Sequence, residues 1–290
     1  MNKLKRWILV LLMVCTPTVY ALEIKGHLVQ GGWVQLKLEP LSKVDFGGRQ
    51  LQADTEGLLL IAFARNEAST KTLTVINPSG KTQTHRLNIA QREYVVQHID
   101  GLPPKHVTPD EATLAKIRED NRKAAEARKI NVRTPFFLQG FEWPAEGWIT
   151  GIYGSQRILN GHARNPHLGV DIAAPVGTPI YAPSAGKVTL VEPMELAGNT
   201  IFVDHGYGLR SDFMHLEKMY VKVGDLVEKG QLIATMGATG RATGSHLHWG
   251  MSWFDVRIDP ASVFNLDRSL VRGAQVLQGK LVYEDQQAKR

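Results

Sequence analysis

Residues 244–250 read Gly-Ser-His-Leu-His-Trp-Gly, and this stretch decides the fold. Side chains two residues apart share one face of a strand, whereas on a helix they diverge by about 200°. His246 and His248 therefore reach a common site only where the chain is extended, and Leu247 and Trp249 then alternate onto the other face. The stretch predicts a strand with two imidazoles on one face. An H-x-H pair on its own is more often a surface feature, so a site needs further residues.

A second pair of candidate residues, His167 and Asp171, is spaced by four positions. Glycine, β-branched residues and a nearby proline disfavour a helix here (Gly169, Val170, Ile172, Pro175). A straight strand would hold the two side chains about 13 Å apart, which is too far for one metal ion with bonds of about 2 Å. We therefore expect the chain to bend between them, at Gly169.

The remaining histidines divide into one candidate and several without a role. Six of the ten histidines lie between residues 162 and 248, so chemistry is expected in that half of the chain. His215, in Asp-Phe-Met-His-Leu at 212–216, is expected at a strand end. His205, in a turn at 204–208, is expected to be structural.

The combination of these elements is much more specific than its parts. The chain contains H-x-x-x-D at 167–171, Asp-His-Gly at 204–206, His-Leu at 215–216 and T-G-x-x-T-G-x-H-L-H at 239–248. This order resembles the lysostaphin-type (LytM-domain) zinc metallopeptidases, which cleave peptidoglycan peptides. The match runs from about Gly154 to Pro260. It does not cover residues 22–133 or the tail after about 267.

The resemblance implies a role for each matched residue. His167, Asp171 and His248 would bind one Zn²⁺ per chain, and His215 and His246 would be catalytic residues that do not bind the metal. Every position of the motif is filled. Some relatives that lack these residues only activate other wall hydrolases, and the intact set favours an enzyme instead.

A set of two imidazoles and one carboxylate suits catalysis. Three protein ligands leave the fourth tetrahedral position of zinc open to water, as in catalytic rather than structural sites. Zinc lowers the pKa of such a water to about 7. We expect one of His215 and His246 to take a proton and the other to steady the oxyanion. The sequence does not assign these two roles.

The substrate groove is less well defined by the sequence. Asn160 and Arg164 lie just before the first expected ligand and are candidates for binding substrate. Residues 193–199 and 252–257 are candidates for the other groove walls.

The first 21 residues have the anatomy of a signal peptide. Lys3, Lys5 and Arg6 precede an apolar run at 7–15, which would span only about 14 Å as a helix against about 30 Å of hydrocarbon. Cleavage after Ala21 would leave no cysteine, because Cys15 is the only one. An uncleaved anchor and lipidation of Cys15 are the alternatives. We expect export to the periplasm or cell envelope, with no stable membrane span after cleavage.

The pattern of apolar residues predicts a mainly β protein. Turn residues interrupt short β-rich runs such as 33–38, 72–76, 200–204 and 231–235. Thr108 as the capping residue, Pro109 in the first turn and Glu111 three residues after the cap predict a helix start, followed by an Ala/Lys/Arg/Glu-rich run to Lys129. We expect a solvent-facing linker helix, a partner-docking surface or a helix lying over the neighbouring domain.

The predicted division is a signal peptide (1–21), a small N-terminal β domain (22–102), a helical linker (103–134), an all-β metallopeptidase domain with curved antiparallel sheets (135–267) and a tail (268–290).

Composition narrows the function further. The 290 residues are 43% hydrophobic and 21% charged, as in globular proteins, with 34 Lys and Arg against 28 Asp and Glu. Three of those basic residues are in the leader, so the mature chain lacks the basic excess that nucleic-acid binding usually needs. We expect an exported zinc endopeptidase acting on peptidoglycan cross-links or stem peptides. The alternatives are a non-catalytic regulator of another wall hydrolase and a secreted bacteriolytic enzyme. The N-terminal domain or the helix could bind the wall or a protein partner, or could cover the groove.

Overall fold

The computed structural model describes residues 21–99, 110–159, 162–163, 165–264 and 271–283. Over these residues the protein is mainly β with antiparallel sheets, a small N-terminal β region and one long α-helix, which confirms the predicted fold class. The predicted signal peptide lies outside the described residues except for Ala21. None of the helices within the described ranges has the length and apolarity needed to cross a bilayer.

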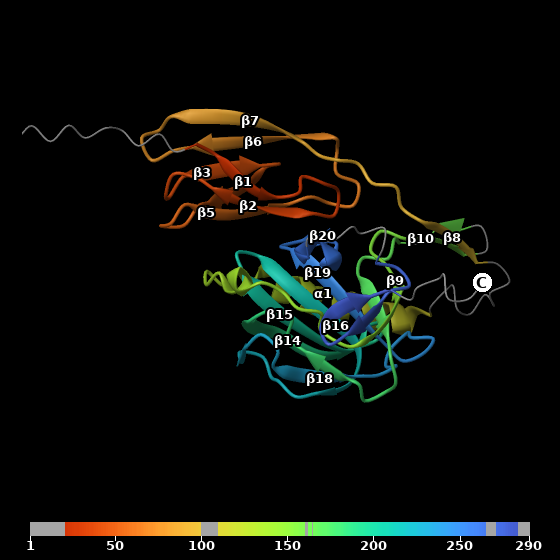
Figure 1. Ribbon diagram of the computed structural model, residues 1–290. Helices are drawn as coiled ribbons and strands as arrows, with labels where there is room; N and C mark the ends of the chain where they lie inside the picture. Colours follow the sequence, from red (N-terminus) through yellow and green to blue (C-terminus); the bar gives the residue numbers. More distant parts are fainter. Residues whose placement is uncertain (1–20, 100–109, 160–161, 164, 265–270, 284–290) are drawn as a thin grey trace, which may run out of the picture.

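The N-terminal region contains two small sheets (Figure 1). In β2, Val34 and Leu36 are buried and alternate with less buried residues, as the sequence pattern predicts. The first sheet contains β1 (Glu23–Gly26), β2 (Trp33–Lys37) and β5 (Leu58–Ala62). The second contains β3 (Lys43–Phe46), β4 (Arg49–Gln52), β6 (Thr70–Ile76) and β7 (Thr82–Asn88).

The C-terminal half is built on one large antiparallel sheet. Its main path runs β17-β14-β15-β16-β19-β12-β9-β21-β22, and β13, β18 and β20 branch from it. The strands are β9 (Gly147–Gly151), β12 (Val170–Ala173), β13 (Pro179–Tyr181), β14 (Gly186–Met194), β15 (Gly198–Gly206), β16 (Leu209–Met219), β17 (Leu226–Val227), β18 (Leu232–Met236), β19 (His246–Trp253), β20 (Val256–Ile258), β21 (Gln275–Leu277) and β22 (Lys280–Val282). A separate small sheet joins β8 (Val96–Ile99), β10 (Gln156–Leu159) and β11 (His162–Ala163), and short 3-10 helices cover Phe136–Gln139 and Pro260–Val263.

The large sheet extends beyond the predicted domain end at residue 267. β21 pairs with β9, and the side chain of Val276 is fully buried. A strand that pairs with the large sheet and buries an apolar side chain in the core is part of that sheet. The segment 275–282 is therefore not a tail. The other domain boundaries stay a prediction.

Strand β16 changes partners at His215. Residues 209–214 pair with β19, whereas residues from Leu216 onward pair with β18. His215 itself adopts φ 62°, a left-handed conformation that is uncommon for residues other than glycine. It therefore lies within the strand, at an irregularity, and the prediction that it ends a strand was wrong.

Helix α1 (Glu111–Lys129) packs against the large sheet. Ala124 and Ala127 are buried against Leu190 of β14 and Phe202 of β15. This confirms the third expectation for the helix, that it lies over the neighbouring domain. Its N-cap is Asp110, whose carboxylate accepts a hydrogen bond from the Thr113 N–H, so the prediction of Thr108 as the cap was wrong. Asp is as good an N-cap as Thr, and starting there leaves Glu111 in the first turn.

Candidate active site

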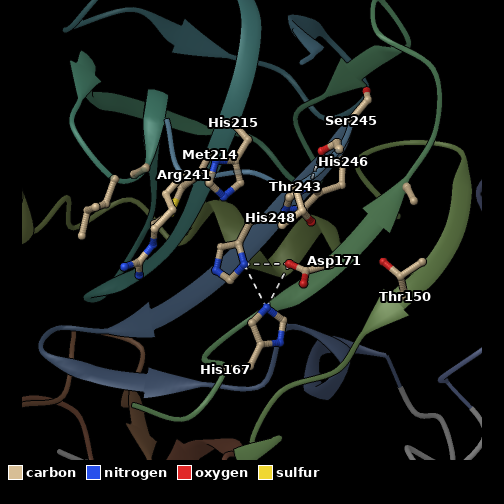
Figure 2. A pocket seen from close by; sticks show the side chains of 14 residues that line it. Thr150, His167, Asp171, Met214, His215, Arg241, Thr243, Ser245, His246 and His248 are labelled. Atoms are coloured by element: carbon tan, nitrogen blue, oxygen red, sulfur yellow. Dashed lines mark hydrogen bonds and ion pairs between the residues drawn. The ribbon is translucent and has the colours of Figure 1, made fainter. Parts of the chain in front are cut away.

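Strand pairing brings the three expected metal ligands together. Asp171 of β12 lies directly opposite His248 of β19 in the antiparallel ladder, and His167 approaches from the loop before β12 (Figure 2). The distances are 2.9 Å from His167 Nε2 to Asp171 Oδ1, 2.8 Å from His248 Nδ1 to the same oxygen, and 3.0 Å between the two nitrogens. Three ligand atoms thus form a compact triangle at the base of a groove.

The chemistry of these atoms fits a divalent cation. His167 Nδ1 lies 3.0 Å from the Ile152 carbonyl oxygen, to which only an N–H can donate. Nε2 of a neutral His167 therefore carries a lone pair, which faces a carboxylate oxygen and a second imidazole nitrogen. Ligands of a tetrahedral zinc with bonds of about 2.0 Å lie about 3.3 Å apart, so a small outward movement would accommodate the ion. The carbonyl of Ile152 would also fix the ring orientation, as is usual for metal-binding histidines.

Burial and hydrogen bonding set the charges in this group. Burial raises the pKa of Asp171, but the bonds from His167 and His248 outweigh it and hold the pKa well below its ordinary value. Burial lowers the pKa of His248, against the opposing effect of Asp171. The result is an ionised carboxylate beside an imidazole that favours its neutral form, which are the protonation states that a metal needs.

The expected bend between His167 and Asp171 is present at Gly169. A side chain there would meet His248, because a Cβ on Gly169 would lie 2.6 Å from His248 Nε2. Gly169 therefore serves the site by permitting close approach as well as by permitting the bend.

His215 and His246 form a second pair beside the ligands. Their ring centroids are 4.7 Å apart, and the His215 ring lies 6.4 Å from that of His248. His215 Nδ1 lies 2.9 Å from the Thr239 carbonyl oxygen and His246 Nδ1 lies 2.9 Å from that of Gly244. When each Nδ1–H donates to its carbonyl, Nε2 of each ring is left with a lone pair. Burial lowers the pKa of His215 to about 4, and the neighbouring histidines act in the same direction against the bond to Thr239.

The five residues lie in a cavity of about 600 Å³. Leu196 and Ala197 form one wall, which confirms that part of 193–199 borders the groove. In Figure 2, Arg241 and Thr150 lie on opposite sides of the metal-ligand group. The full lining is Thr150, His167, Asp171, Ala173, Leu196, Ala197, Met214, His215, Arg241, Thr243, Gly244, Ser245, His246 and His248.

Of the other predictions for the substrate groove, one lies outside the described residues and one is wrong. Asn160 and Arg164 lie outside the described residues. Residues 252–257 do not line the cavity; they lie at the other end of β19, where Phe254 borders a different cavity with N-terminal residues such as Leu51. The strand length explains this error, since eight residues of β19 separate the two ends by about 25 Å. Thr150, Met214 and Arg241 were missed, although Arg241 falls within the T-G-x-x-T-G motif and this position was a visible signal.

His205 is structural, as predicted. The ring is fully buried, with Nδ1 2.8 Å from the Ala185 carbonyl oxygen and Nε2 2.8 Å from Ser211 Oγ. Both ring nitrogens are used by the core, so neither is available to a ligand.

A groove floored by two imidazoles and a carboxylate, with two further imidazoles beside it, is an arrangement that suits a metal-dependent hydrolase. Comparison with known proteins gives the family. Residues 165–260, about a third of the chain, match the family described as Peptidase family M23.

Several relatives share this domain. Peptidoglycan DD-endopeptidase ShyB of Vibrio cholerae is 46% identical over 84 residues, which are 29% of this chain and 20% of ShyB. The uncharacterized lipoprotein YgeR of Escherichia coli is 37% identical over 122 residues, which are 41% of this chain and 48% of YgeR. The chain thus spans about a fifth of the first of these relatives and about half of the second.

A solved structure resembles most of the molecule. The crystal structure of an M23 protein from Pseudomonas aeruginosa has a TM-score of 0.65 at 27% identity, and the match covers 82% of this chain and 95% of that one. The likeness therefore extends beyond the family segment into the N-terminal region.

Proposed function

We propose that this protein is an exported zinc metallo-endopeptidase that hydrolyses peptide bonds in bacterial peptidoglycan. The observation that supports it most strongly is the convergence of His167 Nε2, Asp171 Oδ1 and His248 Nδ1 within 3.0 Å of one another. Three electron-pair donors at such distances repel one another unless a cation or protons lie between them. The substrate class is proposed from ShyB, whose name gives peptidoglycan as its substrate.

In the proposed mechanism, zinc bound by His167, Asp171 and His248 supplies a Lewis acid that polarises the scissile carbonyl and makes water acidic. His215 and His246 both direct an Nε2 lone pair away from their carbonyl partners. Either can therefore accept the proton of the attacking water and later deliver it to the leaving amine. The other, once it has taken up a proton from solvent, can donate a hydrogen bond to the oxyanion.

The cavity walls suit an extended peptide. Leu196, Ala197 and Met214 provide apolar contacts, whereas Thr150, Thr243 and Ser245 provide hydroxyl groups. Such a mixture binds backbone and small side chains of a peptide that crosses the metal group. Export is proposed from the leader at residues 1–21.

The test is digestion of purified peptidoglycan sacculi by the mature chain, with and without a chelator. We expect soluble muropeptides whose masses identify the cleaved bond, about one zinc per chain, and loss of release on chelation. Asp171→Ala is the matched control, because it removes one ligand and leaves the other groove residues. A protein that holds no zinc and releases nothing from sacculi would contradict the proposal and favour the regulator.

A further inference from the structure

Helix α1 contacts the segment 193–199, part of which forms one wall of the groove. Asp120, a partly buried residue of α1, accepts a hydrogen bond from the Glu195 N–H at 2.7 Å. Glu195 immediately precedes Leu196 and Ala197, which line the cavity. Helix α1 lies outside residues 165–260, so this contact comes from outside the family segment.

The helix is itself fixed to the sheet. Ala124 and Ala127 are buried against Leu190 and Phe202, and such packing holds a helix better than exposed contacts do. Two ion pairs flank the Asp120 bond, Lys123–Glu192 at 3.0 Å and Lys116–Glu195 at 3.7 Å. Both are partly exposed, so each contributes little energy. The Asp120 bond is exposed as well, but it joins a carboxylate to a backbone N–H, and such charge-assisted hydrogen bonds are stronger than neutral ones.

On its other side, the same wall is bonded to the catalytic region. The Ala197 carbonyl accepts from the His215 N–H at 2.8 Å, and the Leu196 carbonyl accepts from the Arg241 N–H at 2.9 Å. The bond to Ala197 holds His215 where β16 changes partners and φ is positive. A residue in such a conformation depends on its surroundings to stay there.

We propose that Asp120 is a positioning residue: by fixing the Glu195 backbone, it holds the 193–199 wall in the conformation that binds substrate and supports His215. The helical linker is then part of the working groove, although it touches neither metal nor substrate. The effect on catalysis rests on the proposed function; the effect on the wall does not.

Three variants of the full mature chain separate the possibilities. Asp120→Ala removes the acceptor, whereas Asp120→Asn keeps a carboxamide oxygen that can accept the same bond. Glu119→Ala is the matched control, because Glu119 is exposed and, within the described part of the chain, its carboxylate bonds to Arg122 of the same helix. We expect Asp120→Ala to speed hydrogen exchange of the Glu195 amide and to lower kcat/KM on muropeptides, mainly through KM, each by about fivefold. Asp120→Asn should recover most of both losses, and Glu119→Ala should match the wild type.

Hydrogen exchange of the Glu195 amide and kcat/KM test separate parts of the proposal. Unchanged exchange at Glu195 in Asp120→Ala overturns the inference whatever the activity, as does equal impairment of Asp120→Ala and Asp120→Asn. If exchange responds as expected and the wild type cleaves no peptidoglycan, the positioning contact stands and the proposed activity fails. If exchange responds and kcat/KM does not, the wall is fixed by Asp120 without consequence for catalysis, and the inference is wrong.

Discussion

The role of each histidine depends on which of its two ring nitrogens is already bonded within the protein. His167, His215 and His246 each have Nδ1 within 3.0 Å of a backbone carbonyl oxygen, which commits that nitrogen to donating. The opposite nitrogen is then free to act in the groove. His205 is a useful contrast, because Ala185 and Ser211 occupy both of its nitrogens.

The paired histidines should be separable from the metal ligands. We expect His215→Ala and His246→Ala to lower kcat about 10²- to 10⁴-fold, as loss of proton transfer does. Zinc content should stay near that of the wild type, whereas His167→Ala should lose zinc as well as turnover. Metal analysis of each purified variant beside its turnover on muropeptides checks this. Loss of zinc in His215→Ala would mean that His215 is a ligand.

Arg241 is the residue most able to select substrates by charge. Among the residues that line the cavity it is the only Lys or Arg, and its guanidinium makes no ion pair with another described side chain. We expect the wild type to cleave a muropeptide with a free carboxylate near the scissile bond about tenfold more efficiently than its amidated form, since charge-assisted hydrogen bonds are strong. Arg241→Ala should cleave both forms equally. An undiminished preference in that variant would exclude Arg241 as its source.

Burial of His205 should make stability depend on pH. Burial lowers its pKa to about 4 from 6.5, against the bond to Ala185, so between these values the unfolded chain binds a proton that the folded chain does not. Unfolding free energy therefore falls as pH drops from 6.5 towards 4, by up to about 3 kcal/mol. Urea denaturation at several pH values measures this. In His205→Gln the slope should be shallower, and an equal slope in both proteins would assign the effect to other groups.

At the scale of elements, the sequence predicts which side chains share one face of a strand. It does not predict which residues of two different strands lie opposite each other. Alternation along β19 places His246 and His248 on one face, with Leu247 and Trp249 buried on the other, as expected. That Asp171 stands opposite His248 follows from the register of β12 and β19, which no local pattern contains. The partner change at His215 is equally invisible, because it depends on β18 and β19 competing for one strand.

Strand β16 also contains a buried charge that ties it to its neighbours. Asp212 is fully buried, and its carboxylate forms ion pairs with Arg257 of β20 and with Arg128 of α1. Burial raises its pKa, but Arg257, Arg128 and Arg210 outweigh burial and keep Asp212 ionised. Two guanidinium groups from two other elements thus pair with one carboxylate, and the charge of Arg210 in β16 adds to their effect.

Removing that carboxylate should be costly. We expect Asp212→Asn to lower the free energy of unfolding by about 3 kcal/mol, because it removes the fully buried partner of two partly buried guanidinium groups. Asp255→Asn is the matched control: Asp255 pairs with Arg49 but is largely exposed, so its loss should cost less than about 1 kcal/mol. Urea denaturation compares the two. Similar small costs for both would show that the arginines find other partners.

At the scale of the whole molecule, the N-terminal sheets and the large sheet share one hydrophobic core. Phe46 of β3 packs edge-on against Trp253 of β19 at 6.3 Å between centroids, and Trp33 of β2 packs against Phe137 at 6.0 Å. The Phe46–Trp253 contact lies at the end of β19 remote from His246. All residues that line the cavity around Asp171 and His215 come from Thr150 onward, so the described part of the N-terminal region packs against the large sheet and does not line that cavity.

A shared core predicts that the two parts unfold together. We expect calorimetry of the mature chain to show one transition whose calorimetric and van't Hoff enthalpies agree. Phe46→Ala should shift that whole transition downward, because deleting a buried phenylalanine costs about 3–5 kcal/mol. Ile76→Ala, which truncates an exposed side chain on the adjacent strand, should shift it little. Two separate transitions, with Phe46→Ala affecting only one, would show that the sheets are independent units.

For the same reason a chain beginning near residue 135 should be less stable than the full mature protein, since it would expose Trp253 and lose the contacts of Arg128 and Asp120 with the large sheet.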